Sequence, residues 1–310
     1  MTKYSLIGII MSINFVTVRA DLISSLKCGR EIKNAVFPSN CDELVKIWQD
    51  IGEDAIFLGG LSNTLVASEV NTYVVFSDRL RGIKRHGTII SSGAGERTSS
   101  VAAFAKKNGL SGMEALSAIP GTIGGAVKGN AGCFDTEISD ILYGVEVFKF
   151  DTGTVEYYSR EELFFSYRYG NLLDGREMVV KVYLALSEGD IDSIEKRTRK
   201  YLAIRKATQP SLPSLGSVFR RHEGVSAGYY IEQAGLKGTR IGGMEFSTVH
   251  ANFIVNVGGT PEDYIDLVIL AERKVYEKFG IKLIREVKII DEEDGKFGST
   301  GGARRYKGKA

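Results

Sequence analysis

Residues 119–126 read IPGTIGGA, and GNAG follows closely at residues 129–132. Glycine loses more conformational entropy on folding than any other residue, so a segment this rich in glycine is costly to order. Such a segment suits a place where the main chain must come very close to a bound group, because glycine turns expose backbone N–H groups that bind anions. We therefore expect it to bind a phosphate-bearing cofactor rather than to serve core packing alone.

Two shorter glycine motifs precede this stretch. LGGLSN (58–63) ends the apolar run AIFL, and its small residues, with the Ser62 and Asn63 side chains, suit a pyrophosphate. A plain strand-to-helix turn is the alternative for this motif. GAGE (93–96) begins like the dinucleotide fingerprint GxGxxG, but Thr98 stands where the third glycine belongs. Because no GxxxxGK[ST] motif occurs, the three motifs predict a phosphate- or flavin-binding site without nucleotide hydrolysis.

The composition is that of an ordinary globular protein, with 25% charged and 43% hydrophobic residues among 310. Lys and Arg number 40 and Asp and Glu 38, and the resulting net charge of +2 argues against nucleic-acid binding by bulk electrostatics. The three cysteines are widely spaced, which predicts free thiols in a reducing compartment. The three histidines share no ligand spacing, so we expect no zinc or iron site.

The amino terminus leaves two possibilities open. Residues 1–20 faintly resemble a secretory signal, with an early lysine and an apolar run from Leu6 to Val18. Polar residues interrupt that run, however, and we expect a cytoplasmic protein. No other stretch approaches the roughly 18 uninterrupted apolar residues of a membrane span, so we expect none. Residues 291–310 are rich in glycine and charge, which predicts a flexible tail.

Strand and helix patterns alternate through the first two thirds of the chain, which predicts an α/β arrangement. The expected strands are 55–58, 72–76, 88–91, 145–150, 154–158 and 178–186, and the expected helices are 40–51, 99–108 and 190–206. Prolines then end the last helix, so we place a domain boundary near Pro210. Beyond it we expect a strand at 251–257, a helix that Thr260 caps and Gly280 follows, and a closing strand at 282–290.

An ordered series of motifs resembles the UDP-N-acetylenolpyruvoylglucosamine reductase family. The series is LGGLSN, GAGE, GLSGMEALSAIPGTIGGAVKGNAG, FSYRYG, QPSLPSLGSVF, AGLKG, HANFIVN and REVKII, from about Gly59 to Ile290. No extra substrate-covering loop separates SLGSVF from HANFIVN, as in the shorter of the family's two types. The resemblance implies an α+β chain with the FAD-binding fold of the vanillyl-alcohol-oxidase (PCMH) class. Two α/β subdomains at 21–86 and 87–206 would hold FAD, and a C-terminal α+β domain at 207–290 would bind substrate.

The resemblance also implies a reaction of peptidoglycan precursor synthesis. NADPH reduces FAD, leaves, and is replaced in the same pocket by a UDP-sugar, whose enolpyruvyl group is reduced to give UDP-N-acetylmuramate. Hydride adds to the carbon distal to the carboxylate, and the negative charge on the adjacent carbon must be stabilised and protonated. Carried over by motif, Arg168 polarises the carboxylate and Ser217 delivers the proton as general acid. Glu286 holds the reacting group together with Arg168.

The remaining site residues are also carried over from the motifs. Those expected to bind FAD come from the glycine motifs and are Gly59, Gly60, Ser62, Asn63, Gly95, Pro120, Gly121, Thr122, Gly124, Gly125, Ala126, Asn130 and Gly132. Those expected to bind the sugar nucleotide are Tyr167, Arg221, Lys237, His250 and Lys288. The cations among them suit a diphosphate or carboxylate, whereas a lone histidine beside a strand is more often a core residue.

The sequence departs from the family pattern in four places. Leu61 stands where the family has a third glycine, and a positive φ there would strain leucine by roughly 1–2 kcal/mol. Arg30 replaces the second glycine of an early pair, Phe134-Asp135 replaces Tyr-Gly, and Arg220-Arg221-His222 replaces Lys-Asn-Pro. Two alternatives therefore stay open: a catalytically silent homologue that binds flavin or UDP-sugar, and another oxidoreductase on the same flavin fold. Oligomeric state does not follow from the sequence.

Overall fold

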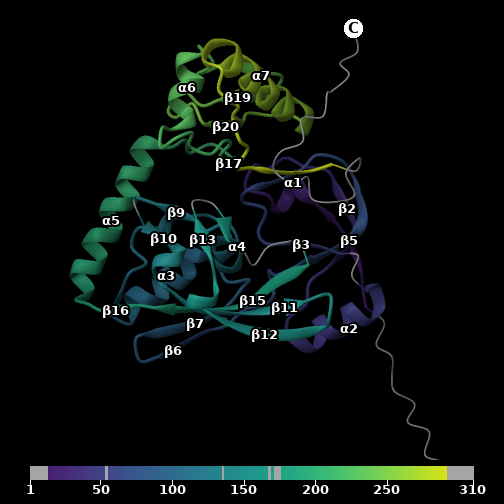
Figure 1. Cartoon of the computed structure of the whole chain (residues 1–310), viewed down its shortest axis with the longest axis vertical. Coiled ribbons are helices and arrows are strands. Elements are labelled where there is room, and N and C mark those ends of the chain that lie inside the picture. Colours follow the sequence, from purple (N-terminus) through teal and green to yellow (C-terminus); the bar gives the residue numbers. More distant parts are fainter. Residues whose placement is uncertain (1–12, 53–54, 135, 167–168, 171–175, 292–310) are drawn as a thin grey trace, which may run out of the picture.

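The computed structural model describes residues 13–52, 55–134, 136–166, 169–170 and 176–291. Two larger sheets lie in the first part of the chain, and all but the last of the elements that follow the long helix α5 (Ile191–Thr208) gather at the opposite end of the molecule (Figure 1). The glycine motifs are far from the SLGSVF and HANFIVN motifs along the chain. Only tertiary contacts can bring the two groups of motifs together.

A four-stranded sheet lies nearest the amino terminus. In spatial order its strands are β1 (Val16–Arg19), β2 (Glu31–Val36), β5 (Val70–Phe76) and β3 (Ala55–Leu58). β5 is parallel to both β2 and β3, whereas β1 is antiparallel to β2. Parallel strands need a crossover connection, and the predicted helix α2 (Cys41–Ile51) connects β2 to β3. Asn40 caps α2 by accepting the Glu43 N–H at 2.9 Å.

The second large sheet is antiparallel throughout. In spatial order its strands are β12 (Thr154–Ser159), β11 (Leu142–Lys149), β15 (Glu177–Ala185), β7 (Ile89–Gly93) and β6 (Ile83–His86). Residues of α3 (Thr98–Lys107) and α4 (Ile123–Lys128) share one buried apolar cluster with this sheet. Short pieces complete this part: α1 (Ala20–Ile23), β8 (Leu110–Ser111) with β16 (Ser187–Glu188), β9 (Gly132–Cys133) with β10 (Thr136–Glu137), β13 (Phe165–Ser166) with β14 (Tyr169–Gly170), and the 3-10 turns η1 (Leu116–Ala118), η2 (Ile138–Asp140) and η3 (Arg160–Glu162).

The C-terminal part is a third sheet covered by two helices. Its strands, in order, are β17 (Ser214–Ser217), β20 (Phe253–Asn256), β19 (Met244–Phe246) and β18 (Arg240–Ile241), and its helices are α6 (Ala227–Gln233) and α7 (Pro261–Phe279). Thr260 accepts the Asp263 N–H at 3.3 Å at the start of α7, and Gly280 ends the helix with φ +69°. The predicted helix and both of its caps are therefore confirmed.

The apolar cores cross the proposed domain boundaries. Leu26, Cys28 and Leu65 are buried in the cluster that is centred on α7 and the C-terminal sheet. Phe148 and Phe150 of the second sheet region join Phe57 of β3 in another cluster. The division at residues 86 and 206 stays a proposal, and any such subdomains would share buried surface.

One predicted strand is wrong. The expected closing strand at 282–290 is regular only in β21 (Lys288–Ile290), which pairs in parallel with β4 (Thr64–Val66). The preceding residues bond instead to the loop after β17, because the Arg220 N–H donates to the Ile284 carbonyl at 2.9 Å.

The LGGLSN motif leads into β4, so the alternative of a strand-to-helix turn is also wrong. The expected strand at 251–257 is shorter, as β20.

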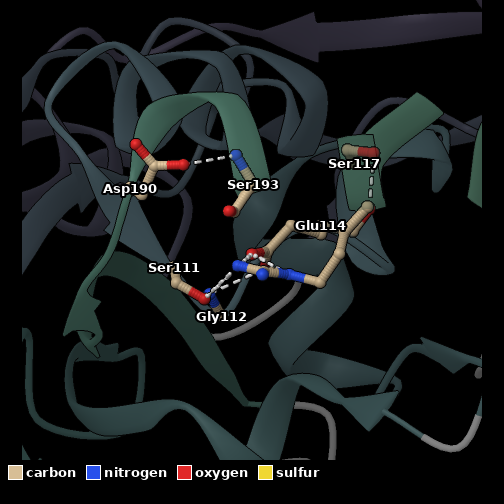
Figure 2. Close-up of polar contacts among 7 residues, drawn as sticks. Ser111, Gly112, Glu114, Ser117, Asp190 and Ser193 are labelled. Atoms are coloured by element: carbon tan, nitrogen blue, oxygen red, sulfur yellow. Dashed lines mark hydrogen bonds and ion pairs between the residues drawn. The ribbon is translucent and has the colours of Figure 1, made fainter. Parts of the chain in front are cut away.

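A buried carboxylate fixes α5 to the second sheet region. Figure 2 shows Ser111 and Gly112 gathered around Glu114, which is 7% exposed. The Arg197 guanidinium of α5 donates to Glu114 Oε1 at 2.7 Å, and the Gly112 N–H donates to Oε2 at 2.7 Å. Beside this pair lies a mostly apolar cavity of about 290 Å³ between α3, η1 and α5. No residue of the three glycine motifs lines it, so it is separate from the expected cofactor site.

The described residues contain neither a metal-binding cluster nor a membrane-spanning helix. No group of three His, Cys, Asp or Glu side chains there is placed to hold a metal ion. Among the helices in the described ranges, none is both long and apolar enough to cross a bilayer.

Candidate functional site

The LGGLSN and IPGTIGGA motifs lie against each other. A Cβ placed on Gly59 would stand 2.7 Å from Thr122 Oγ1, and one on Gly60 would stand 3.7 Å from the Gly121 Cα. A Cβ on Gly121, whose φ is +98°, would overlap the Ser62 hydroxyl. A side chain would therefore clash at Gly59 and at Gly121 but not at Gly60, and two motifs more than fifty residues apart form one surface.

The GAGE motif joins the same surface through backbone hydrogen bonds. The Ile123 N–H donates to the Glu96 carbonyl at 2.8 Å, and the Gly124 N–H donates to the Ala94 carbonyl at 2.9 Å. Gly95, Gly124 and Gly132 are packed tightly: a Cβ on each would meet Ser77, Ala94 or Thr136, respectively. Close backbone packing thus accounts for glycine at these three positions, whether or not they also touch a cofactor.

Other residues of the motifs are open. Gly125 and Pro120 are exposed, and Thr122 accepts the Gly125 N–H at 3.3 Å as the cap of α4. The backbone N–H groups of Gly60, Ser62 and Asn63 have no acceptor in the part of the chain that the structure describes. The Leu61 N–H between them donates to the Gly59 carbonyl at 2.9 Å, and several free N–H groups so close together in a glycine loop suit an anion. The loops therefore fit the diphosphate of a dinucleotide cofactor such as FAD.

Two further predicted cofactor residues are buried. Ala126 is 6% exposed, and Asn130 is fully buried with φ +41°. The Asn130 side chain donates to Glu137 at 2.7 Å and accepts the Ser139 N–H at 3.3 Å. Asn130 thus shapes the loop between α4 and β10.

Ser217 and Glu286, from distant motifs, lie in hydrogen-bonded segments. The Val218 carbonyl accepts the Glu286 N–H at 2.8 Å and the Val287 N–H at 3.3 Å. Asn63 joins them, because its side-chain amide donates to the Glu286 carbonyl at 3.1 Å. The LGGLSN, SLGSVF and REVKII motifs therefore meet at one place.

Arg168 and Tyr167 lie outside the described residues. The strands on either side of them, β13 and β14, pair with each other, and β14 contacts α4. Their roles stay predictions that rest on the SYRYG motif.

The predicted substrate cations have different surroundings. Lys288 is held at the motif junction, because its N–H donates to the Asn63 carbonyl at 3.0 Å. Burial and the charge of Arg220 lower the pKa of its ammonium group. Lys237 pairs with Glu232 at 2.9 Å, and Arg221 is exposed.

The His250 ring accepts a hydrogen bond at Nδ1 from the Asn252 N–H, at 3.2 Å. Burial lowers the pKa of His250, so the neutral ring with its proton on Nε2 is favoured.

Sequence reasoning missed Lys128, at the end of α4. Burial and the charge of Lys288 lower the pKa of the Lys128 ammonium to about 8. Among the described residues, no carboxylate lies within ion-pair distance of it. An incompletely compensated cation in a partly buried setting is unfavourable by itself, and an anionic ligand would stabilise it. The signal in the sequence was a lysine inside the glycine-rich stretch GGAVKGNAG.

Local contacts explain three of the residues that depart from the family pattern, whereas Asp135 lies outside the described residues. Leu61 does adopt a positive φ, +46°, and its side chain is 3% exposed in the core beneath the loop. Arg30 forms an ion pair with Glu262 of α7 at 2.8 Å. Phe134, with φ +52°, stacks on Tyr201 of α5 at 5.1 Å between ring centroids.

Comparisons with known proteins agree along most of the chain. A family model described as FAD binding domain matches residues 32–158, and one described as UDP-N-acetylenolpyruvoylglucosamine reductase, C-terminal domain, matches residues 208–290. A Streptococcus pneumoniae (strain Hungary19A-6) UDP-N-acetylenolpyruvoylglucosamine reductase is 38% identical over 275 residues, covering 87% of this chain and 91% of the relative. One from Caldanaerobacter subterraneus is 36% identical over 276 residues, with the same coverage of 87% and 91%.

A solved structure gives the same result. The crystal structure of UDP-N-acetylenolpyruvylglucosamine reductase (MurB) from Thermus caldophilus superimposes with a TM-score of 0.77 at 32% identity. The match covers 90% of this chain and all (100%) of that one. The likeness therefore includes the cofactor loops and the C-terminal domain together.

Proposed function

This chain belongs to the UDP-N-acetylenolpyruvoylglucosamine reductase family and is an FAD-dependent oxidoreductase of peptidoglycan precursor synthesis, and we propose that Ser217 and Glu286 act together on its enolpyruvyl substrate. Its fold is the α+β FAD-binding fold of the PCMH class with a further C-terminal domain. The alternative of another oxidoreductase on the same flavin fold is set aside. The alternative of a silent homologue is addressed by the experiment below.

FAD, when bound, supplies the hydride that reduces the substrate alkene. The open N–H groups of Gly60, Ser62 and Asn63 would hold its diphosphate. NADPH, whose role rests on the family resemblance, is the proposed reductant. The proposed substrate is a UDP-sugar, with Arg221, Lys237, His250, Lys288 and Tyr167 as its binding residues. Cytoplasmic location is also proposed, because the three cysteines are odd in number and widely spaced in the sequence, as is usual in a reducing compartment.

The residues of this chain stabilise and protonate the substrate. After hydride addition, the new C–H bond leaves an enolate on the carbon that carries the carboxylate. The Ser217 hydroxyl gives its proton to that carbon and regains one from solvent. Arg168 and Glu286 hold the carboxylate while its charge is greatest. The hydride and the proton together saturate the double bond.

One observation supports this assignment most strongly. Glu286 is tied by its backbone to Val218, the residue directly after Ser217, and by its carbonyl to Asn63 of the predicted cofactor loop. The segments that carry the proposed proton donor and the proposed acidic group are thus bonded to each other and to the predicted cofactor loop.

The test separates the two half-reactions. Ser217→Ala should let NADPH bleach the bound flavin at the normal rate and slow its recolouring by the enolpyruvyl substrate by about 10²–10⁴-fold. Ser214→Ala, on the same strand, is the matched control and should change neither rate. Equal loss of both half-reactions in Ser217→Ala would refute the proposed role. A parent protein that binds FAD but never recolours with this substrate would establish the silent homologue.

A further inference from the structure

The strand that carries Ser217 is irregular. β17 pairs with β20 only at Ser214 and at Ser217, and the register shifts between these two residues. Gly216, directly before Ser217, has φ +79°. The strand ladder alone therefore holds the end of β17 weakly, so another contact must fix the serine if it is to reach one substrate carbon.

Asn252 provides that contact. It is 4% exposed and directly precedes β20. Its Oδ1 accepts the Phe219 N–H at 3.0 Å, and its Nδ2 donates to the Phe219 carbonyl at 2.8 Å. Its own backbone carbonyl accepts the Val218 N–H at 2.8 Å. Three hydrogen bonds thus hold the two residues that follow Ser217.

Asn252 is itself fixed from its other side. Its N–H donates to His250 Nδ1 at 3.2 Å, and the Phe253 N–H donates to the His250 carbonyl at 3.0 Å. The Ser247 hydroxyl accepts the Val249 N–H at 3.1 Å. These bonds tie the turn before β20 to the Asn252 backbone, and the two bonds to Phe219 favour one orientation of the Asn252 amide.

We propose that Asn252 is the positioning residue for the Ser217 proton donor: its amide fixes the backbone after Ser217, and through the Val218 carbonyl the same unit is joined to Glu286. This inference rests on the proposed function of Ser217. Proton transfer needs the donor within hydrogen-bond reach of the acceptor, and a displacement of 1 Å can lower a rate by about 10²-fold. Asn252 does not touch the reacting atoms.

The experiment compares Asn252, which directly precedes β20, with Asn256, which ends it. In Asn252→Ala, NADPH should bleach the flavin within about two-fold of the parent rate, whereas recolouring by the enolpyruvyl substrate should slow by about 10- to 100-fold. The loss should be in kcat rather than KM, and the solvent deuterium isotope effect on recolouring should increase. The matched control is Asn256→Ala. The Asn256 side chain makes four hydrogen bonds, to Leu26, Lys27, Gly258 and Gly259, but none to the loop after Ser217.

The control separates positioning from stability. Asn256→Ala should lower the melting temperature without selectively slowing recolouring. If Asn252→Ala does not fold, the isosteric Asn252→Asp carries the test, because it retains the acceptor for the Phe219 N–H and loses the donor. Equal slowing of recolouring in the Asn252 and Asn256 variants, or none in either Asn252 variant, would overturn the inference. A Ser217→Ala protein without a selective defect would overturn the proposed function itself, and this inference with it.

Discussion

The backbone N–H of Glu286 donates to the carbonyl oxygen of Val218 at 2.8 Å, although the two residues belong to different motifs of the C-terminal domain. The bond places the REVKII segment directly beside the residue after Ser217. The Asn63 amide, 3.1 Å from the Glu286 carbonyl oxygen, adds the LGGLSN loop to this pair. Three segments thus meet through backbone and amide hydrogen bonds at the place where the site is proposed.

Leu61 provides a test of strain against burial. Its positive φ favours glycine, but its buried side chain contributes to the core. Leu61→Ala should lower the free energy of unfolding by about 2–5 kcal/mol, because it leaves a cavity and keeps the strain. Leu61→Gly should be more stable than Leu61→Ala by about 1 kcal/mol, because only the strain is relieved. Urea denaturation of the flavin-free protein measures both values, and an alanine variant more stable than the glycine variant would contradict the strain.

Gly124 and Gly125 should respond differently to valine. A Cβ on Gly124 would stand 2.7 Å from the Ala94 Cβ, whereas Gly125 is exposed and its nearest contact would be Thr122 Oγ1 at 3.2 Å. Gly124→Val should therefore destabilise the fold by about 1–3 kcal/mol through overpacking. Gly125→Val should leave the apoprotein folded and reduce bound FAD, measured by absorbance after gel filtration. Full FAD occupancy in Gly125→Val would show that the cofactor does not lie over this helix start.

Lys128 should make stability depend on pH on the alkaline side. Its pKa in the folded protein is lowered from 10.5 to about 8, mainly by burial. Between these values the unfolded chain binds more protons, so the free energy of unfolding should rise as the pH increases from about 8 to 10.5. Lys128→Gln should remove this rise, and the variant should be more stable than the parent at pH 7.

The comparison is made by urea denaturation of the flavin-free protein at pH 7 and pH 10. Lys107→Gln, at an exposed position of α3, is the control and should shift the free energy of unfolding equally at both values. A Lys128→Gln protein that is less stable than the parent at pH 7 would contradict the assignment. A bound anionic ligand should reduce the difference in stability between Lys128→Gln and the parent at pH 7, because the ligand stabilises the charged form of Lys128.

The Glu114–Arg197 ion pair should contribute more to the free energy of unfolding than the surface ion pairs of α5 do. Arg197→Met would leave the buried carboxylate with Ser111 and the Gly112 N–H, at an expected cost of about 1–3 kcal/mol. Burial acts to raise the pKa of Glu114, but the hydrogen bonds from Arg197, Gly112 and Ser111 hold it below its usual value.

Its contribution is therefore present at neutral pH and is lost as the pH falls through the folded pKa. The difference in free energy of unfolding between Arg197→Met and the parent should therefore decrease as the pH is lowered. Arg199→Met, which removes an exposed pair with Glu195 at 2.7 Å, should cost no more than about 0.5 kcal/mol. Equal losses in the two variants would show that burial of Glu114 adds nothing.

Local features of the sequence were sufficient for several elements. Asn40 and Gly52 bracket α2, and Thr260 and Gly280 bracket α7, because capping depends on residues within one turn of the helix end. The alternation at 282–290 predicted a full strand and was wrong, because the partner of that segment is the loop after β17. Alternation records which side chains are buried and does not record which segment the backbone bonds to.

Part of the candidate site was likewise predicted from the sequence, and part of it was not. The glycine motifs and the family resemblance pointed to FAD, and the comparisons agree with that cofactor. Lys128 and Asn252 were not predicted. The depressed pKa of Lys128 depends on Lys288 and on burial, and the role of Asn252 depends on hydrogen bonds to Phe219. Neither contact has a local signature in the chain.

By itself, the sequence determined the helix ends, the glycine turns and the family, since each depends on residue types over a short span or on motifs in a fixed order. Tertiary structure decided which segments meet: it joined Glu286 to Val218, Asn63 to Glu286 and Asn252 to Phe219. These contacts are backbone and amide hydrogen bonds across long loops. Their geometry follows from packing of the whole chain, because no individual residue type specifies its distant partner.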